Sequence, residues 1–245
     1  MSKTLKRAVI IICICVALSI AFLALCFFKV IHLNGLFSDD YKLRGVDISN
    51  YQGTVDWQKL SSQDIDFAYI KATEGSSYTD ERFEYNLSEA LKTKLYIGAY
   101  HFFSFDSSGV SQAEHFIKTV PKRSGMLPPV IDLEYYGEYF SDPKDKEDVI
   151  PEVIAMADKL EAHYGVKPVI YATGKSYRKY IKGTELERYP LWIRNVYIKP
   201  FFADEWVFWQ YADDNKLEGY SGDEENIDMN VFFGNEEQLK NMTIN

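Results

Sequence analysis

The sequence predicts an α/β fold, namely an irregular TIM-like βα barrel with eight strands and fewer than eight helices. Three observations support this fold: eight short runs of β-branched and aromatic residues, helical patterns between the earlier runs, and about 190 residues to hold them, fewer than the ~250 typical of such barrels. The expected strands cover residues 45–49, 67–73, 96–103, 130–134, 168–172, 191–195, 207–211 and 226–230.

The strand runs differ from the helical ones in their pattern. The run Phe-Ala-Tyr-Ile at 67–70 is continuously apolar, as expected for a strand of a parallel sheet that is buried on both faces. Helical patterns cover residues 80–93, 111–120 and 146–164, and Pro151 should kink or split the last of these helices, because proline cannot donate the helical hydrogen bond. The last three strands leave little room for helices between them.

The N-terminus contains a 21-residue apolar run, residues 8–28, whose only polar member is Ser19. As a helix this run spans roughly 30 Å, which is the hydrocarbon thickness of a bilayer. A cleaved signal peptide, which has a shorter apolar region of about 7 to 15 residues, is the alternative. Because Lys3, Lys6 and Arg7 precede the run, we expect the N-terminus to stay in the cytoplasm.

These features divide the chain into four expected parts. They are a cytoplasmic tail (residues 1–7), a transmembrane signal anchor (8–31), a linker (32–42) and a barrel domain (43–245). When fully extended, the linker reaches at most roughly 35 Å. We therefore expect a single-pass protein of the cell membrane whose barrel lies outside, close to the membrane, with secretion after signal cleavage as the alternative.

Charge and cysteine content exclude several functions for the barrel. Four of the 27 Lys and Arg residues lie in the first 35 residues, so residues 36–245 carry 23 of them against 36 Asp and Glu, a formal charge of −13. Such an acidic surface repels phosphate backbones, and nucleic acid is therefore not an expected partner. The cysteines Cys13, Cys15 and Cys26 all lie in the apolar run, which leaves none for disulfides or thiolate chemistry in the barrel.

Four carboxylates lie in or at the ends of expected strands: Asp47 in the first, Asp132 and Glu134 in the fourth, and Asp228 in the last. In a βα barrel the C-terminal ends of the strands carry the chemistry, and the first and last strands become neighbours on closure. Because side chains alternate along a strand, Asp132 and Glu134 share one face and should point into the same cleft. Their apolar surroundings predict burial, which is costly for a carboxylate without a partner.

Carboxylates clustered in a cleft without metal ligands are best explained by glycoside hydrolysis. One acid, whose pKa is raised by its surroundings, protonates the leaving oxygen, while the others stabilise the oxocarbenium-like charge. Aromatic side chains in or near the strands would then form platforms on which sugar rings stack. The expected substrate-binding residues are Tyr100, Tyr171, Trp192, Trp209 and Tyr211.

We expect neither a metal nor another cofactor. Zinc hydrolysis needs a compact ligand set, but His101, His115 and His163 are scattered along the chain. His101 lies in an apolar strand and is expected to be a hydrogen-bonded structural residue, with a substrate contact as the alternative. The acidic segment 223–225 lacks an EF-hand pattern and is expected to be a solvated loop. We find no Gly-rich phosphate loop and no nucleophile elbow.

Short segments of the chain match, in order and at compatible spacing, the motifs of one enzyme family. The segments are Arg-Gly-Val-Asp-Ile-Ser at 44–49 with Tyr51-Gln52 and Asp56-Trp57, Phe-Ala-Tyr-Ile-Lys-Ala-Thr-Glu-Gly at 67–75, Gly-Ala-Tyr-His-Phe at 98–102, Asp-Leu-Glu at 132–134, Ile-Tyr at 170–171, Leu-Trp-Ile at 191–193, Trp-Gln-Tyr at 209–211 and Ile-Asp-Met-Asn at 227–230. Through this set the chain resembles the family 25 glycoside hydrolases, Chalaropsis-type lysozymes that act as N-acetylmuramidases on bacterial peptidoglycan. The match covers almost the whole barrel domain.

The resemblance implies a function for each of the four acids. Glu134 corresponds to the catalytic acid/base and Asp132 to its partner, while Asp47 and Asp228 match the other two active-site aspartates of the family. Whether the nucleophile is a carboxylate or the N-acetyl oxygen of the substrate is left open. In the substrate-assisted route Asp132 would orient and polarise the acetamido group. The family barrel is irregular, in agreement with the sparse helices noted above.

The expected function is therefore that of a membrane-anchored peptidoglycan hydrolase, a lysozyme that cleaves the β-1,4 bonds between N-acetylmuramic acid and N-acetylglucosamine. The alternative is a catalytically inactive glycan-binding or scaffold protein of the cell wall on the same barrel, and the presence of all four acids favours the enzyme. The expected partners are peptidoglycan glycan strands and, through the N-terminal helix, the membrane. We expect the catalytic domain to be monomeric and to face the cell wall.

Overall fold

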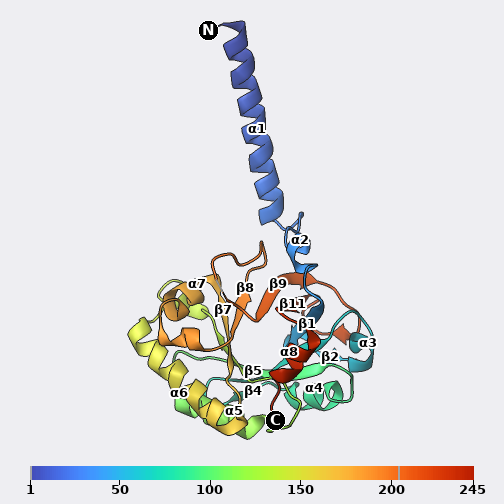
Figure 1. The fold of residues 1–245 in the computed structure, drawn as a ribbon, viewed down its shortest axis with the longest axis vertical. Coiled ribbons are helices and arrows are strands. Elements are labelled where there is room, and N and C mark those ends of the chain that lie inside the picture. The colour runs from blue at the N-terminus through green and yellow to red at the C-terminus, as the bar shows by residue number, and fades with distance from the viewer. Residues whose placement is uncertain (1, 204) are drawn as a thin grey trace.

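The computed structural model describes residues 2–203 and 205–245 and contains a closed barrel of eight strands (Figure 1). The strands follow the order β1-β11-β9-β8-β7-β6-β5-β3, and pairing of β1 with β3 closes the ring. The predicted fold class is confirmed. The barrel strands are β1 (Leu43–Ile48), β3 (Phe67–Glu74), β5 (Tyr96–Phe102), β6 (Val130–Leu133), β7 (Val169–Thr173), β8 (Leu191–Arg194), β9 (Phe208–Asn215) and β11 (Ile227–Phe232). Three two-residue strands lie outside the ring: β2 (Thr54–Val55), β4 (Tyr78–Thr79) and β10 (Tyr220–Ser221).

The helices cover the first part of the barrel more fully than the last. Between barrel strands lie α3 (Trp57–Ser61), α4 (Phe83–Ala90), α5 (Gly109–Thr119), α6 (Lys146–Tyr164) and the short α7 (Gly174–Ser176), and α8 (Glu236–Asn241) follows the last strand. Of the two expected effects of Pro151, a split of the helix is wrong, because α6 runs through this residue without interruption, and a kink stays a prediction. The two preceding predicted helices are also present, with shorter bounds at 83–90 and shifted bounds at 109–119.

The last strand, β11, is antiparallel to its neighbours, which the sequence did not indicate. Adjacent strands from β1 through β3 to β9 pair in parallel, whereas β11 is antiparallel to both β9 and β1. The connection from β9 to β11 contains only the small strand β10, so that the chain turns back directly instead of crossing over through a helix. As a result, the first residues of β11 lie at the rim where the parallel strands end.

Two glycines permit the packing of the barrel interior, which is filled by large aromatic side chains. A Cβ atom on Gly45 would lie 2.4 Å from the ring of Phe67, and one on Gly98 would lie 2.2 Å from the ring of Tyr69. Both rings are fully buried, and they contact Phe208 in the centre of the barrel. Leu127, Phe232 and Leu239 belong to the same interior cluster and close the N-terminal end of the barrel. Only the opposite end is left for a cleft.

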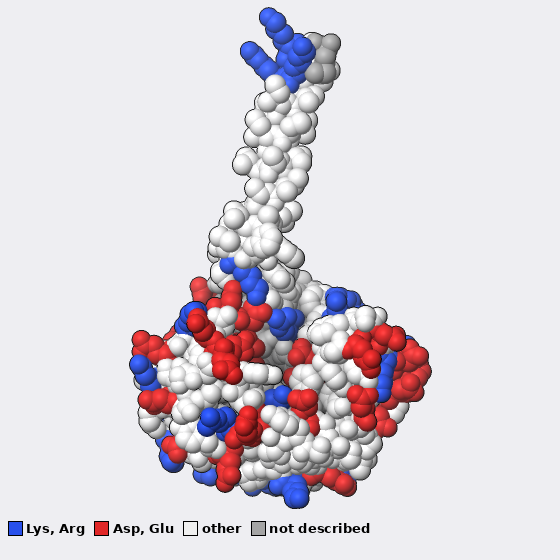
Figure 2. All heavy atoms as spheres, turned by 180° about the vertical axis from the view of Figure 1, so that it is seen from behind, with Lys and Arg blue, Asp and Glu red and all other residues white. Residues whose placement is uncertain are grey.

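The N-terminal helix α1 (Lys3–Phe27) projects from the barrel and has no buried residue (Figures 1 and 2). Among the described residues it is the one helix long and apolar enough to cross a membrane, a test that a signal sequence passes as well. The segment that follows is packed against the barrel, and it includes the short helix α2 (Gly35–Ser38). Asn34 and Ser38 are buried, and the Asn34 amide donates to the backbone carbonyls of Asn195 and Tyr211. Tertiary contacts therefore hold much of segment 32–42, the predicted linker, against the barrel.

Candidate active site

The four predicted acids meet in one cleft at the C-terminal end of the barrel. Asp47 of β1 and Asp228 of β11 are direct partners in the antiparallel register, which confirms that the first and last strands are neighbours. Asp132 lies near the end of β6, and Glu134 follows directly after that strand. All four side chains line the same cleft. The antiparallel direction of β11 explains the position of Asp228, since its second residue lies at the rim.

Asp47 and Asp228 are embedded in a network of hydrogen bonds. The amide of Gln210 donates to Asp47 Oδ2 over 3.0 Å and to Asp228 Oδ2 over 2.9 Å. The amide of Asn230 donates to the same Asp47 oxygen over 2.7 Å and accepts from the indole N–H of Trp192 over 2.9 Å. Three strands, β8, β9 and β11, thus fix the two carboxyl groups in place.

Burial shifts the protonation of this pair. Burial and the negative charge of Asp47 raise the pKa of Asp228 to about 9, so that Asp228 is protonated at neutral pH. Burial also raises the pKa of Asp47, whereas hydrogen bonds from Asn230, Gln210 and Asp228 lower it. Asp228 therefore holds a proton at neutral pH, while hydrogen bonds from three neighbours favour the ionised form of Asp47 against the effect of burial.

Asp132 and Glu134 lie in a different environment. Burial raises the pKa of Asp132 well above its ordinary value, and the negative charges of Glu134 and Asp47 add to this effect. Burial likewise raises the pKa of Glu134, while the positive charges of Arg194 and Lys71 oppose the increase. Within the described part of the chain no donor reaches the buried oxygen Asp132 Oδ1. The cleft thus holds a carboxyl pair with raised pKa values and a free acceptor.

Two cations beside the carboxyl groups were not predicted. Lys71 lines the cleft, its ammonium group lies 2.8 Å from Glu74 Oε2, and it stands 5.0 Å from the centre of the Phe102 ring. Arg194 ends β8 and pairs with Asp213 Oδ2 over 2.7 Å. A signal for Lys71 existed in the sequence, since a lysine inside an apolar strand needs a negative partner.

The five predicted aromatic residues divide into two groups. Tyr100, Tyr171 and Trp192 line the cleft, and the Tyr171 hydroxyl donates to Gln210 Oε1 over 2.8 Å. Trp209 and Tyr211 do not reach the cleft, because they point from β9 to the outer side of the barrel, where their rings contact each other. Strand alternation is the reason: with these two side chains outside, Gln210 between them faces the cleft.

Three further points compare the structure with the sequence expectations: other aromatic residues of the cleft, the role of His101, and a metal site. Tyr51 and Phe102 also line the cleft, although they were not among the predicted sugar platforms. His101 is a buried structural residue, as predicted, since its ring nitrogens hydrogen-bond Thr73 over 2.7 Å and Gln112 over 2.9 Å, and burial lowers its pKa to about 4. Across residues 2–203 and 205–245, no group of three or more His, Cys, Asp and Glu side chains is arranged to hold a metal ion.

The chain is similar in sequence and in structure to several known proteins. The family model described as Glycosyl hydrolases family 25 matches residues 46–220. A solved family 25 glycosyl hydrolase from Bacillus anthracis has 50% sequence identity and a TM-score of 0.78, and the match covers 83% of this chain and 94% of that protein. Among sequence relatives, the uncharacterized protein YegX of Escherichia coli O157:H7 is 33% identical over 207 residues, which cover 82% of this chain and 73% of the relative. Lysozyme M1 of Streptomyces globisporus is 29% identical over 223 residues, which cover 82% and 71%.

Proposed function

This chain belongs to glycosyl hydrolase family 25, and from that premise we propose that it is a peptidoglycan hydrolase of the Chalaropsis type, an N-acetylmuramidase. It cleaves the β-1,4 bond between N-acetylmuramic acid and N-acetylglucosamine. The observation that carries the proposal is the cleft in which one hydrogen-bonded carboxyl pair lies beside a second pair with raised pKa values. The lysozyme of S. globisporus supports the choice of substrate.

Glu134 is the general acid in this proposal. Its pKa is raised by burial, so that it keeps its proton at a higher pH than a solvated glutamate, and it can protonate the leaving glycosidic oxygen. Arg194 and Lys71 limit the increase of the pKa. The carboxylate that results then activates a water molecule in the second half of the reaction.

Asp132 stabilises the positive charge that develops at the anomeric carbon. Its buried Oδ1 has an unused acceptor position among the described residues, which is available to the substrate. Two routes remain open: Asp132 attacks the anomeric carbon as a nucleophile, or it accepts a hydrogen bond from the acetamido N–H while the acetamido oxygen attacks. Because the charges of Asp132 and Glu134 repel each other, the cleft favours one ionised and one protonated carboxyl group.

Asp47 and Asp228 position the reacting groups and the sugar. Gln210 bridges them, and Asn230 connects Asp47 to Trp192. The negative charge of Asp47 also raises the pKa values of Asp132 and Glu134, so that this pair helps to keep a proton on the acid. Tyr100, Tyr171 and Trp192 line the cleft and provide apolar surface for the sugar rings.

The chain is localised by α1, which we propose to be an uncleaved signal anchor with its N-terminus in the cytoplasm. Lys3, Lys6 and Arg7 lie at the free end of the helix, as the blue end of α1 in Figure 2 shows, and the acidic barrel lies at the other end. The barrel then faces the cell wall. Release of the barrel after cleavage of this segment is the alternative.

Digestion of purified peptidoglycan tests the proposed bond specificity. Products reduced with borohydride should carry reduced N-acetylmuramic acid at their ends, as identified by mass spectrometry. Reduced N-acetylglucosamine would instead identify a glucosaminidase. A folded protein that binds the glycan without releasing reducing ends would support the inactive scaffold, an alternative that the complete set of four acids disfavours.

Protease added to intact protoplasts tests the topology. We expect the barrel to be degraded while the N-terminal tail stays protected by the membrane. Recovery of the whole barrel from the medium, as a protein that begins shortly after the apolar run, would show that the segment is a cleaved signal.

A further inference from the structure

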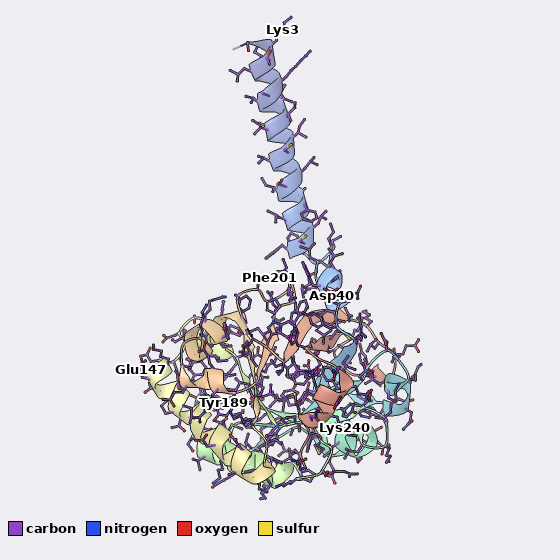
Figure 3. The ribbon with its side chains drawn as sticks, in the orientation of Figure 1. Lys3, Asp40, Glu147, Tyr189, Phe201 and Lys240 are labelled. Carbon is purple, nitrogen blue, oxygen red and sulfur yellow. The ribbon has the colours of Figure 1, made fainter. Side chains whose placement is uncertain are left out.

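Large apolar side chains are exposed around the foot of α1, where a solvated barrel would be expected to present polar groups. Phe28 is 74% exposed, Leu36 is 74% exposed and Phe201 is 65% exposed. Figure 3 shows Phe201 beside the foot of α1. The full set, which we call the foot surface, comprises Phe27 at the end of α1, Phe28 and Val30 directly after it, Leu36 from α2, and Tyr197, Ile198 and Phe201 from the connection that follows β8.

The foot surface joins the end of α1 to the barrel by direct contacts. The ring of Phe27 stacks on the ring of Tyr197 with 6.3 Å between the ring centres and 4° between the planes. Phe37 of α2 meets Phe201 edge-on at 5.8 Å. Ring contacts therefore join the three chain segments that carry these exposed apolar side chains.

Polar contacts hold the same segments together. Lys29 forms an ion pair with Asp213, and His32 Nε2 lies 3.0 Å from Asp214 Oδ2, both on β9. The buried amide of Asn34 bonds two backbone carbonyls, at the ends of β8 and on β9. These contacts fix the end of α1 on the rim of the barrel that also carries the catalytic cleft.

We propose that the foot surface lies in the interfacial layer of the lipid bilayer, so that the barrel rests on the membrane in a fixed orientation instead of moving on a tether. The occupant is the boundary between lipid headgroups and acyl chains. Continuity is the main argument: Phe27 is the last residue of a helix suited to span the bilayer, so that rings in contact with it lie at the same depth.

The composition of the foot surface agrees with this position. Aromatic side chains such as those of Tyr197 and Phe201 are favourable at the interface, and basic side chains next to them pair with lipid phosphates. Lys199 lies between these two aromatic residues in the chain, and its ammonium group stands 5.5 Å from the centre of the Tyr41 ring. Contiguous exposed apolar surface of this kind marks an interaction site on a protein.

This orientation has a consequence for the substrate. Asp213 binds both Lys29 at the end of α1 and Arg194, whose charge acts on Glu134 in the cleft. The cleft therefore opens within a few side-chain lengths of the bilayer surface. The enzyme acts on glycan strands that lie against the membrane and does not reach the outer layers of the wall. The inference rests on the proposed insertion of α1.

Depth-dependent fluorescence quenching of the full chain in liposomes tests this inference. Cys13, Cys15 and Cys26 are replaced by Ala, and a single cysteine carrying an environment-sensitive dye is introduced by Phe201→Cys, or by Ile198→Cys as a second site on the foot surface. Lys240→Cys is the matched control, because Lys240 is exposed on α8, away from α1 (Figure 3). With lipids spin-labelled near the headgroup, we expect quenching at positions 201 and 198 several-fold stronger than at 240.

A further variant separates failure of this inference from failure of the anchor. It retains Cys13 as its single labelled cysteine, and lipids labelled deep in the acyl chain should quench it if α1 spans the bilayer. Quenched Cys13 together with positions 201 and 198 that respond like 240 would overturn the foot surface while leaving the anchor intact. Unquenched Cys13 would overturn both. Protection of position 201 by self-association, without quenching by lipid, would assign the surface to a second copy of the chain and overturn the inference.

Discussion

The two carboxyl pairs of the cleft differ in how their hydrogen-bonding capacity is used. Asp47 and Asp228 lie on two strands that pair with each other, β1 and β11. The pair receives hydrogen bonds from the side-chain amides of Gln210 and Asn230. Asp132, across the barrel on β6, keeps a buried oxygen for which the described residues provide no donor. An unsatisfied buried acceptor costs about 1–3 kcal/mol, so that a bound substrate that donates to it gains this amount.

This difference separates positioning groups from reacting groups. The Asp47/Asp228 pair is complete before the substrate binds, and it can hold its geometry throughout the reaction. In the Asp132/Glu134 pair, the buried oxygen of Asp132 gains a hydrogen-bond donor only when the substrate binds. Interactions that are stronger in the transition state than in the ground state are the ones that accelerate the chemical step. Substitutions in the second pair should therefore reduce turnover most, and substitutions around the first should act less strongly.

Glu134→Gln should have the largest effect. The amide preserves the shape of the side chain but cannot deliver a proton, so we expect a loss of about 10²- to 10⁴-fold in kcat for solubilised glycan, without loss of the circular-dichroism spectrum of the fold. Glu138→Gln, an exposed change four residues further on, is the control and should leave turnover unchanged. A folded Glu134→Gln protein with near-normal activity would remove Glu134 from the acid role.

Asp132→Asn should also be severe, with a loss on the order of 10²-fold or more, because the neutral amide no longer stabilises positive charge at the anomeric carbon. Activity of Asp132→Ala with added azide then distinguishes the two routes. An azide product of inverted configuration would identify Asp132 as the nucleophile, whereas no rescue would favour orientation of the acetamido group. Wild-type turnover of Asp132→Asn would contradict both roles.

The sequence was sufficient for the elements whose pattern depends on local burial. The continuous apolar run at 67–70 correctly predicted a strand buried on both faces, and Asp132 and Glu134 were correctly placed on one face because alternation within a strand is a local property. The adjacency of Asp47 and Asp228 followed from barrel closure alone. The first two predictions needed only local patterns, and the third needed only the fold class.

Other features depended on contacts that local patterns do not contain. In the Trp-Gln-Tyr run of β9 both faces are buried, so that hydrophobicity could not decide whether Gln210 or its aromatic neighbours face the cleft. The segment after α1 is short and mixes polar with apolar residues, and Asn34 and Ser38 are buried because β9 and the end of β8 provide partners for this segment. The role of Arg194 likewise depends on its proximity to Glu134, which lies 60 residues earlier in the chain.

Asp228→Asn tests the difference between the two carboxyl pairs from the side of the positioning pair. This change should reduce activity only slightly and should increase stability. Asp228 is already neutral at pH 7, since its pKa is raised to about 9, and an amide is neutral as well. We expect a loss in kcat of less than about tenfold. Asp47→Asn should be worse, because it removes the negative charge that accepts from Gln210 and Asn230.

The stability of Asp228→Asn should depend on pH in a defined direction. In the unfolded chain Asp228 ionises near its ordinary pKa of 3.8, whereas in the folded chain it stays protonated up to about pH 9, so that wild-type stability falls as the pH rises between these values. Urea unfolding should show a gain for Asp228→Asn on the order of 1 kcal/mol or more at pH 7 and little gain at pH 3. A gain that does not change with pH would contradict the assignment.

Arg194→Gln should have the smallest effect, visible mainly in the pH profile. The positive charge of Arg194 lowers the pKa of Glu134, so its removal should raise that pKa. Because Glu134 acts as a protonated acid, the alkaline limb of kcat/KM should move to higher pH by about one unit or less, with only a modest change in the maximal rate. Arg188→Gln is the matched control, since Arg188 pairs with Asp158 on the outer surface, and it should leave the profile in place. An unchanged alkaline limb in Arg194→Gln, or a shift to lower pH, would show that Arg194 does not control the protonation of the acid, and burial, Asp47 and Lys71 would then determine the pKa of Glu134.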